Sequence, residues 1–598
     1  MTYPIKGIPR DPEDPIPFRK DVDDWYHDQV DPSSNRIQLS LFVEALAAIQ
    51  QRPLSDERSY FRLAGIHSAP YTGWDGVGGV DQVGFCVHGN YTFPTWHRVY
   101  MTLFEQAVYE AMLEFIDQPE HSSVAQDLKN KWKAEAKQWR LPYWDFARFA
   151  RHYTSKPHEQ VIDDNPDTRE LRLPILASMP LVKISVFGSN NEFQFRPNPL
   201  YKFEMEKPMG ELDPPYTITA QIDGDTEYPF DKCKATTRYG LMDGYHADVL
   251  ADGGQHWPRV NLALNEHAWG GSIGTSPERN ATLQELTHRL LLSQIDSWGD
   301  FSSTRNDKKH ARTSQRNYLN LEAIHNNIHN WVGGFYYKRP GPDSWKLWGA
   351  GHMSNVPVAA FDPIFWLYHC NIDRLAAIWQ ALNWDKYFDD PASSGCLNVD
   401  LAPFHKDDKG ISYTSNDVRD WRSLNFDYEI TESRDPDKIT AKVNELYGES
   451  TVALPDAKDY ILTVKYDRYA LGGRPFLINI FIGEVDRKNF YDAGARNFVG
   501  SVFNFSAPIE NTQCRNCIEQ QEQGVMSVAQ LPATWAIKYR DIDVEDVKLS
   551  YVVVDSRGKS ARVKVETKLC ESIQYLGFPG GGTDYHNIAD GAPAEVDY

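Results

Sequence analysis

His325-Asn326-Asn327-Ile328-His329-Asn330-Trp331 and Asp362-Pro363-Ile364-Phe365-Trp366-Leu367-Tyr368-His369 are two motifs within the stretch Leu321–Arg374. Residues four apart lie on one face of a helix, one turn from each other, so His325 and His329 form a pair. His369 follows in a second helical pattern, which begins with an Asp-Pro signal. Three imidazoles that converge from two helices predict a metal site, and all-imidazole coordination suits copper or zinc.

A second trio of histidines lies earlier in the chain, at His67, His88 and His97. Two trios predict two metal ions, and a metal pair in the core of a helical bundle suits oxygen chemistry. Copper is favoured because it cycles between two oxidation states that imidazole supports, whereas zinc has no redox chemistry. Iron and manganese pairs usually recruit Glu-x-x-His motifs. Glu322 has that spacing to His325, but the first trio has no counterpart.

Composition narrows the possible partners and compartment. The 598 residues are 41% hydrophobic and carry a formal net charge of -21, which argues against a nucleic-acid partner. The N-terminus has no apolar signal core, and no run of eighteen apolar residues follows, so we expect a cytoplasmic protein without a membrane partner. Seven scattered cysteines make a disulfide framework unexpected.

The periodicity of the chain changes near residue 458. Up to about residue 430 the pattern is mainly helical and predicts a helical bundle that holds the metals, with a long, irregular insertion at 150–315. Residues 431–457 are charged and predict a cleavable linker. Segments within residues 458–577, including 534–539, alternate with period two or are β-branched runs, and they predict a β-sandwich-like domain. The tail at 578–598 is Gly-rich and acidic, and we expect little order there.

The histidine motifs resemble the two metal sites of the type-3 copper family, which comprises tyrosinases, catechol oxidases and hemocyanins. The resemblance rests on His88 with Phe93-x-x-Trp96-His97-Arg98, and on the motifs at His325-x-x-x-His329-Asn330 and Asp362–Arg374. Cys86-Val87-His88 also matches the Cys-x-His of the fungal tyrosinases, which the chain resembles best. Tyr368 departs from the pattern, because many relatives have a second histidine at that position.

The resemblance implies a function and a cofactor. His67, His88 and His97 would hold one copper ion, and His325, His329 and His369 the other. Cys86 would be joined to His88 as a thioether; an ordinary buried cysteine is the alternative. The implied enzyme uses O2 to hydroxylate monophenols next to their oxygen and to oxidise o-diphenols to o-quinones in pigment (melanin) formation.

Four further positions take roles from the resemblance. A phenol has a pKa of about 10 and must lose its proton to bind copper. Glu322 and Asn326 would hold a water that accepts this proton, although Glu322 could equally be the partner of an imidazole or a cation. Val356 would stand at the entrance for the substrate. Asn330 lies where the family varies its substrate preference.

The C-terminal domain would cover the copper site in a latent form until a protease removes it. An aromatic side chain should then enter the substrate pocket, with Phe505 as first candidate and Phe503 as second; packing in the core of the β-rich domain is an equal alternative. Cys514 and Cys517 resemble a Cys-x-x-Cys that helps to load copper, and two soft thiolates suit Cu(I). A redox dithiol and two unrelated cysteines remain alternatives for this pair.

Two other functions stay open at this stage. One is a catechol or o-aminophenol oxidase with weak activity on monophenols, against which Glu322 and Asn326 argue. The other is an oxygen carrier of the hemocyanin type, which has the same six histidines. The Cys-x-His motif and the cleavable linker favour an enzyme.

Overall fold

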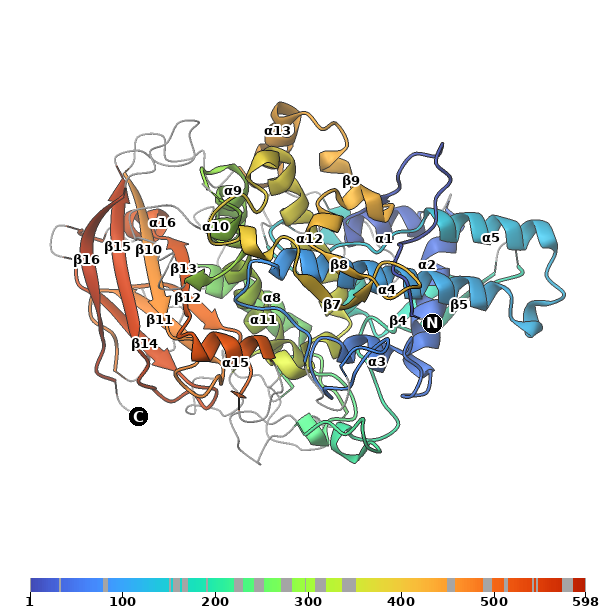
Figure 1. Ribbon diagram of the computed structural model, residues 1–598, viewed down its shortest axis with the longest axis horizontal. Coiled ribbons are helices and arrows are strands. Elements are labelled where there is room, and N and C mark those ends of the chain that lie inside the picture. Colours follow the sequence, from blue (N-terminus) through green and yellow to red (C-terminus); the bar gives the residue numbers. More distant parts are fainter. Residues whose placement is uncertain are drawn as a thin grey trace.

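The computed structural model describes residues 2–31, 34–78, 84–149, 152–153, 162–163, 170–189, 192–219, 230–240, 252–269, 282–295, 297–306, 319–335, 351–448, 458–487, 497–509, 515–539, 542–544, 547–572 and 585–596. Within these ranges a helical domain is followed by a β-rich domain that packs against it (Figure 1). The predicted order of the two domains is confirmed.

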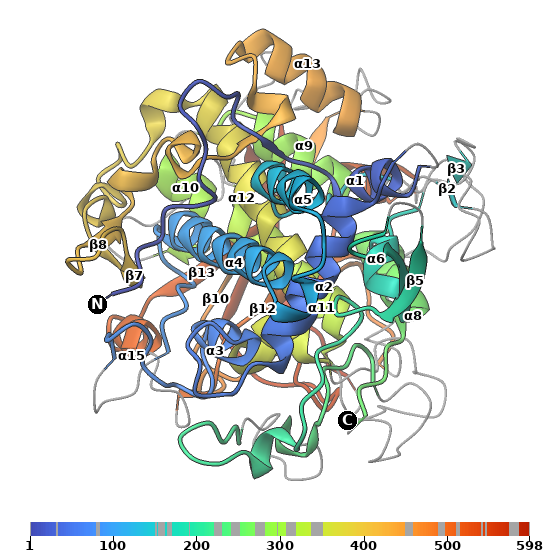
Figure 2. The ribbon, with the colours of Figure 1, turned by 90° about the vertical axis from the view of Figure 1, so that its right-hand side faces the viewer.

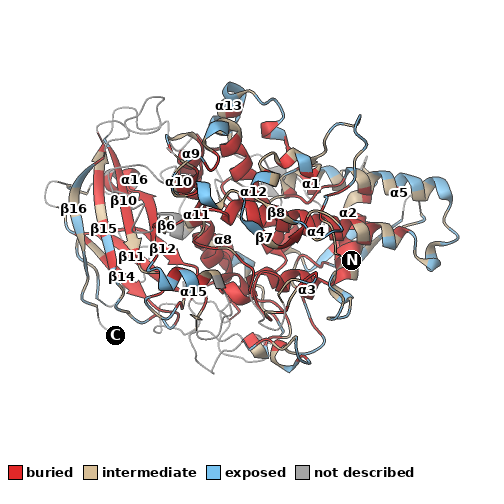
Figure 3. Ribbon diagram, in the orientation of Figure 1, coloured by how far each residue is buried: buried red, intermediate tan, exposed pale blue. Residues whose placement is uncertain are grey.

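Three helices form the centre of the helical domain: α4 (Phe93–Ile116), α11 (Leu321–Gly333) and α12 (Ile364–Leu382). α4 and α12 are hydrophobic around most of their circumference, which predicts helices surrounded by protein. α11 is more polar, and its histidines and asparagines are nevertheless buried. Almost every residue of α12 is buried, and Figure 3 shows the same for α4 and α11. α12 packs against both α4 and α11, so the three helices can bring side chains to one point.

Other helices surround this centre. α2 (Ile37–Gln51) and α5 (Gln126–Gln138) pack against α4, as Figure 2 shows. The remaining α-helices of the described residues are α1 (Val22–Val30), α3 (Tyr60–Gly65), α6 (Ile175–Ser178), α8 (Trp257–Trp269), α9 (Thr282–Leu292), α10 (Trp298–Ser302), α13 (Pro436–Tyr447), α15 (Arg515–Glu522) and α16 (Thr534–Tyr539). Two 3₁₀ turns, η5 (His352–Ser354) and η6 (Val356–Phe361), precede α12.

One mixed sheet dominates the β-rich domain, with strand order β12-β11-β14-β16-β15-β10-β13-β6. Its strands are β6 (Arg305–Asn306), β10 (Asp459–Tyr466), β11 (Phe476–Ile482), β12 (Phe498–Asn504), β13 (Met526–Pro532), β14 (Leu549–Val554), β15 (Val565–Ser572) and β16 (His586–Pro593). Although three strands separate β10 from β11, Leu462 and Ile478 belong to one buried cluster. The sheet therefore curls over its own core, as in a sandwich. Short two-stranded sheets complete the fold: β1 (Phe18–Arg19) with β9 (Asp427–Tyr428), β2 (His152–Tyr153) with β3 (Ile162–Asp163), β4 (Leu181–Ser185) with β5 (Phe193–Pro197), and β7 (Asp400–His405) with β8 (Ser412–Thr414).

Two local predictions were wrong. The tail was expected to lack order, yet β16 pairs with β14 and β15 in the middle of the sheet. Its side chains are largely exposed, so backbone pairing rather than an apolar pattern places it. The segment 534–539 was expected to be a strand but forms α16, where the Thr534 hydroxyl accepts a hydrogen bond from Tyr460 N at 2.8 Å.

The end of the helical domain is fixed by polar contacts in the core. Asp373 of α12 accepts hydrogen bonds from Arg98 (2.5 Å), Arg19 (3.2 Å) and the hydroxyl of Tyr428 (2.6 Å), and all four residues are buried. Its neighbour Arg374 pairs with Asp145 at 3.3 Å. Paired buried charges of this kind are costly to break.

The segment predicted as a linker is partly helical. α13 packs against α9 and α12 and buries Ile439, Val443 and Tyr447. The rest of that segment, 449–457, lies outside the described residues. No helix among the described residues is both long enough and apolar enough to cross a bilayer.

Candidate metal centre

Six histidines converge between the central helices, and each is at most 4% exposed. Three come from helices α11 and α12, and one from α4. The other two stand on non-helical segments, His67 just after α3 and His88 in the loop before α4. The structure thus brings together all six residues that the sequence singled out, from five separate places in the chain: His67, His88, His97, His325, His329 and His369.

The second trio is the more compact. The ring centroids of His325 and His329 lie 4.5 Å apart, and those of His325 and His369 lie 5.0 Å apart. One nitrogen from each of the three rings lies within 4.8 Å of the others. All three rings are buried, as a metal site in a helical bundle requires.

The first trio stands next to it. Ring centroids are separated by 5.3 Å between His67 and His88 and by 5.6 Å between His88 and His97. His97 also stacks on His369 of the second trio, with centroids 4.4 Å apart and an interplanar angle of 14°. The two groups therefore form one cluster that can hold two neighbouring metal ions.

Hydrogen bonds orient these rings through one nitrogen and leave the other for a metal. Nδ1 of His67 meets Val356 O at 3.1 Å, Nδ1 of His97 meets Phe93 O at 2.8 Å, and Nδ1 of His329 meets Met353 O at 2.6 Å. A carbonyl can only accept, so each Nδ1 must donate. A neutral imidazole has one N–H, which leaves Nε2 as a lone pair. This is the arrangement in which backbone carbonyls fix metal-binding histidines.

The free nitrogens fit a metal better than they fit one another. Burial lowers the pKa of all six imidazoles, to about 3 for His67 and well below the usual range for the others, so the rings are neutral. Nε2 of His325 and Nε2 of His329 lie 3.0 Å apart. Nδ1 of His325 is held at 2.9 Å by Asn326 Oδ1, an acceptor. Two lone pairs that face each other repel unless a cation stands between them, and metal–imidazole bonds of about 2.0 Å fit this spacing.

Buried nitrogens without a partner lead to the same conclusion. Among the described residues, Nε2 of His67, of His88 and of His97 makes no hydrogen bond, and neither does any ring nitrogen of His369. Buried polar atoms are normally satisfied, so such a concentration at one place indicates that these nitrogens bind a metal. Neutral imidazoles suit copper and zinc.

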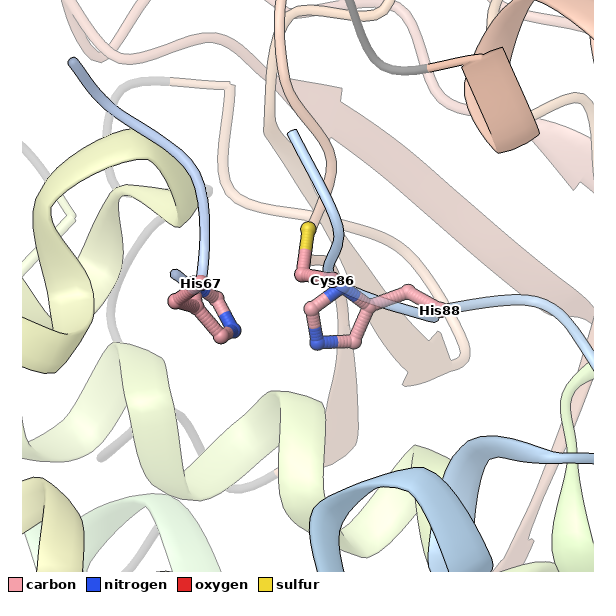
Figure 4. A group of neighbouring side chains, drawn as sticks. All are labelled: His67, Cys86 and His88. Atoms are coloured by element: carbon pink, nitrogen blue, oxygen red, sulfur yellow. The ribbon is translucent and has the colours of Figure 1, made fainter. Parts of the chain in front are cut away.

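Cys86 lies beside the first trio and is buried (Figure 4). In this view the rings of His67 and His88 face each other, and the Cys86 sulfur lies to one side of them. One ligand atom from each of the three residues lies within 4.8 Å of the others. Burial raises the pKa of the Cys86 thiol to about 12. The sulfur is thus close to the His88 ring, as a crosslink between them would need.

Glu322 occupies a more crowded position than the sequence suggested. Its Oε1 accepts the N–H of Gly89 at 2.5 Å, and its Oε2 accepts the N–H of Thr304 at 2.8 Å and the Ser303 hydroxyl at 2.8 Å. The Arg468 guanidinium of the β-rich domain lies 3.9 Å from Oε1. Of the two roles considered for Glu322, the partner of a cation is directly visible. The carboxylate also holds the loop of His88.

The predicted entrance residues serve partly as structural supports. Val356 is buried, and its carbonyl orients His67. Asn330 accepts the N–H of Phe335 at 3.2 Å and so closes the end of α11. Tyr368, the departure from the family pattern, donates its hydroxyl to His325 O at 2.8 Å and stacks on the His325 ring at 5.6 Å.

Phe505 enters the cluster from the β-rich domain. Its ring stacks on His329, with centroids 3.9 Å apart and an interplanar angle of 14°. It also meets the rings of His88 and His325 edge-on, at 5.3 Å and 5.6 Å. Phe505 is completely buried. Phe503, the second candidate, contacts Phe335 at 5.0 Å instead.

Several supporting residues had no recognisable signal in the sequence. From α15, Asn516 and Gln520 donate amide hydrogens to His88 O at 2.9 Å and 2.8 Å. On α11, Asn327 binds the backbone of β12. These are ordinary polar residues that no spacing rule marks. Cys514 lies outside the described residues; Cys517 is disulfide-bonded.

Comparisons with known proteins agree with this geometry. Residues 57–382 match the family profile described as the common central domain of tyrosinase, and residues 459–554 match the tyrosinase C-terminal domain. A curated tyrosinase from Aspergillus fumigatus is 43% identical over 567 residues, which is 90% of this chain and 85% of that protein. Polyphenol oxidase 3 of Agaricus bisporus is 29% identical, over 65% of this chain and 58% of its own.

Solved structures show the same two-domain arrangement. The apo-protyrosinase melB from Aspergillus oryzae superimposes with a TM-score of 0.85 at 52% identity and covers 100% of this chain and 99% of its own. The holo-protyrosinase of the same fungus gives a TM-score of 0.84 at 52% identity, with the same coverage. The β-rich domain is thus shared with proteins described as proenzymes.

Proposed function

Because the chain belongs to the tyrosinase family, in its latent form with a C-terminal domain, we propose that its six histidines hold two copper ions and that Phe505 keeps the substrate out. The observation that carries this proposal is the stacking of Phe505 on His329 at 3.9 Å, inside the cluster of orphaned imidazole nitrogens. An aromatic ring in that position occupies the space that a phenol needs.

The chemistry divides between the metals and the chain. Two bound copper ions would supply the redox chemistry by which O2 hydroxylates a monophenol and oxidises an o-diphenol to an o-quinone. The chain's own part is to hold six neutral imidazoles in place. It also surrounds the substrate ring with apolar and aromatic walls, and it accepts the phenolic proton.

Glu322 and Asn326 are our candidates for proton transfer. Both are buried beside the second trio, and Asn326 already orients His325. Each carboxylate oxygen has two lone pairs. Three donors bind Oε2, whereas Oε1 accepts the N–H of Gly89, so a second lone pair of Oε1 could bind a water. Removal of Arg468 with the β-rich domain would take away the cation that lies 3.9 Å from Oε1.

Val356 and Asn330 take second place in this proposal. The small Val356 side chain next to His67 would leave the entrance open to a phenolic ring. Asn330 would influence preference indirectly, because it fixes the chain at Phe335. We further propose the thioether between Cys86 and His88 and a product that feeds melanin-type pigment formation. We also propose copper loading through Cys514 and Cys517, which would require that the disulfide of Cys517 is first reduced, because a disulfide sulfur is not a thiolate ligand.

Activation would follow proteolysis within 431–457. Because α13 is packed against the helical domain, we expect the cleavage site to lie beyond residue 448. Copper-loaded full chain should oxidise tyrosine and 4-methylcatechol slowly. After limited proteolysis and gel filtration both rates should rise at least about tenfold, because a substrate then replaces a ring that was held intramolecularly. Reversible oxygen binding without any oxidation after the cut would overturn the enzyme proposal in favour of an oxygen carrier. Oxidation of catechol without hydroxylation of tyrosine would assign a catechol oxidase.

The crosslink has its own test. Peptide mass spectrometry of the copper-loaded protein should show the Cys86–His88 peptide two hydrogens lighter than its sequence predicts. An unmodified peptide from fully active enzyme would exclude the thioether.

A further inference from the structure

Asn327 of α11 binds the main chain of the β-rich domain with both ends of its amide. Its Nδ2 donates to Ser501 O at 3.0 Å, and its Oδ1 accepts the N–H of Phe503 at 2.9 Å. Asn327 is 5% exposed, and its contacts are to backbone atoms of the strand. A side chain that binds one acceptor and one donor two residues apart imitates a neighbouring β-strand.

The strand held in this way carries the ring that enters the metal centre. β12 is an edge strand of the sheet and lies beside α11 (Figure 1). Phe505 follows directly after its last residue, Asn504, and stacks on His329. Asn327 therefore contacts the chain two and four residues before an aromatic ring that occupies the centre.

A second contact lies at the residue two positions before that ring. The Phe503 side chain meets the edge of Phe335 at 5.0 Å and 63°. Phe335 lies two residues after the end of α11, and its backbone N–H is held by Asn330 at 3.2 Å. The helical domain thus provides an aromatic contact for this residue as well as the hydrogen bonds of Asn327.

We propose that the opened centre accepts tyrosine residues within extended peptides, and that Asn327 and Phe335 bind the peptide on the N-terminal side of the tyrosine. This inference rests on the proposed function and names a substrate class for the same site. In the latent chain, Ser501–Phe505 occupies the place of such a peptide, with phenylalanine where the substrate has tyrosine.

The contacts differ in what remains after the β-rich domain leaves. Asn327, Phe335 and His329 belong to the helical domain and stay. Arg468, which donates to Phe505 O at 3.1 Å, leaves with the β-rich domain. The ring of a free tyrosine can therefore bind in the centre, but a free tyrosine makes no hydrogen bonds to the side-chain amide of Asn327. It lacks the main-chain N–H two residues before the ring and the carbonyl four residues before it. An extended peptide supplies both.

The test compares matched peptides on protein that has been cleaved within 449–457 and gel-filtered. The first substrate is acetyl-Ser-Val-Phe-Asn-Tyr-amide, which copies residues 501–505 with a terminal tyrosine. The others are N-acetyltyrosine amide, the same pentapeptide N-methylated at its phenylalanine, and a peptide with tyrosine first and the other residues after it. We expect the kcat/KM of the first peptide to exceed that of the others about tenfold or more, because it can form both neutral hydrogen bonds with the Asn327 amide and they cannot.

Binding without copper gives a second readout that does not depend on oxidation. A fluorescently labelled acetyl-Ser-Val-Phe-Asn-Phe-amide should bind the cleaved, copper-free protein, and N-methylation of its central phenylalanine should weaken that binding about threefold to tenfold. In the variant Asn327→Leu the ratio of kcat/KM for the first peptide to that for 4-methylcatechol should fall about tenfold.

The outcomes separate the two proposals. Suppose that 4-methylcatechol is oxidised but that the N-methylated peptide and the peptide with tyrosine first have the same kcat/KM as the first peptide. The peptide site is then excluded, while the proposed function stands. If no catechol is oxidised but the labelled peptide binds copper-free protein and its N-methylated form does not, the proposed function fails and the peptide site stands. Absence of both oxidation and binding overturns both.

Discussion

The two histidine trios reach the same centre by different means. The second trio is mounted on helices: His325 and His329 stand one turn apart on α11, and His369 faces them from α12. The first trio draws its members from three separate segments. His67 follows a short helix, His88 stands on a loop, and only His97 belongs to a long helix. Helix geometry positions the second trio, whereas the first depends on what surrounds its loop.

The loop of His88 is held largely from outside. Asn516 and Gln520 of the β-rich domain bind His88 O, and Glu322 of α11 binds the N–H of Gly89. The second trio is supported from within the helical domain, by Tyr368 and by the carbonyl of Met353. The comparison teaches that the β-rich domain does more than cover the centre, because it also braces one of its two halves.

The largest effect should follow from loss of a helix-mounted ligand. In His329→Ala the copper content should fall from two ions toward one per chain, and catechol oxidation after cleavage should drop by about a thousandfold or more, since a binuclear site needs both ions. Metal analysis and initial rates measure this. His97→Ala, in the first trio, should show the same losses of copper and of activity. If either variant kept full activity with one ion, the two trios would not both be needed for oxidation.

The next largest effect concerns the ring between the trios. Phe505→Ala in the uncut chain should raise catechol oxidation on the order of tenfold, because the variant removes a stacked aromatic contact and opens the space above His329. The matched control is Phe503→Ala, which removes a ring that contacts Phe335 instead. Equal rates for both variants and the parent chain, with unchanged circular dichroism, would show that Phe505 is not the barrier.

A smaller effect should distinguish the trios directly. The double variant Asn516→Ala, Gln520→Ala leaves the His88 carbonyl without its amide donors and should weaken copper binding at the first trio about tenfold, as loss of a supporting shell usually does. A chelator titration should then show two steps where the parent chain shows one. If both ions leave in one step, as in the parent chain, the β-rich domain does not stabilise copper binding at the first trio.

The smallest effect belongs to the second trio. Tyr368→Phe removes the hydroxyl that binds His325 O but keeps the ring that stacks on His325. We expect a loss of about 1 kcal/mol in the free energy of unfolding. Urea denaturation measures that loss. Because the helix itself still places His325, copper release should stay within about threefold of the parent chain, and a larger change would show that α11 alone does not suffice.

Local rules explain what could be predicted from the sequence. The spacing of His325 and His329 depends only on helix geometry, and the alternating or β-branched runs of β10–β14 reflect the local preferences of a strand. The first trio has no such rule, so it was found through its duplication and its resemblance to a family. The prediction that Phe505 enters the metal centre rested on the same resemblance. The sequence did not distinguish that position from packing in the core of the β-rich domain, whereas the structure does.

The unpredicted parts are those that depend on tertiary partners. Asn327, Asn516 and Gln520 are polar residues whose role exists only because β12 and the His88 loop meet them. β16 has no apolar alternation and is held by backbone pairing on both sides. The position of Glu322 among four donors could not be foreseen either, since Ser303 and Thr304 approach it from a different part of the chain.

β6 has a consequence for the timing of activation. This two-residue strand, Arg305–Asn306, belongs to the helical domain but forms one edge of the sheet of the β-rich domain, and Val528 N adds a bond to Thr304 O at 2.8 Å. Cutting the chain beyond residue 448 removes the tether and leaves these bonds intact. The cut thus lowers the effective concentration of one domain at the other from the millimolar range to that of the solution. If the centre opens by loss of the β-rich domain, as proposed, the cut alone would leave the two domains associated, and dilution of the cut protein would set how much of it opens.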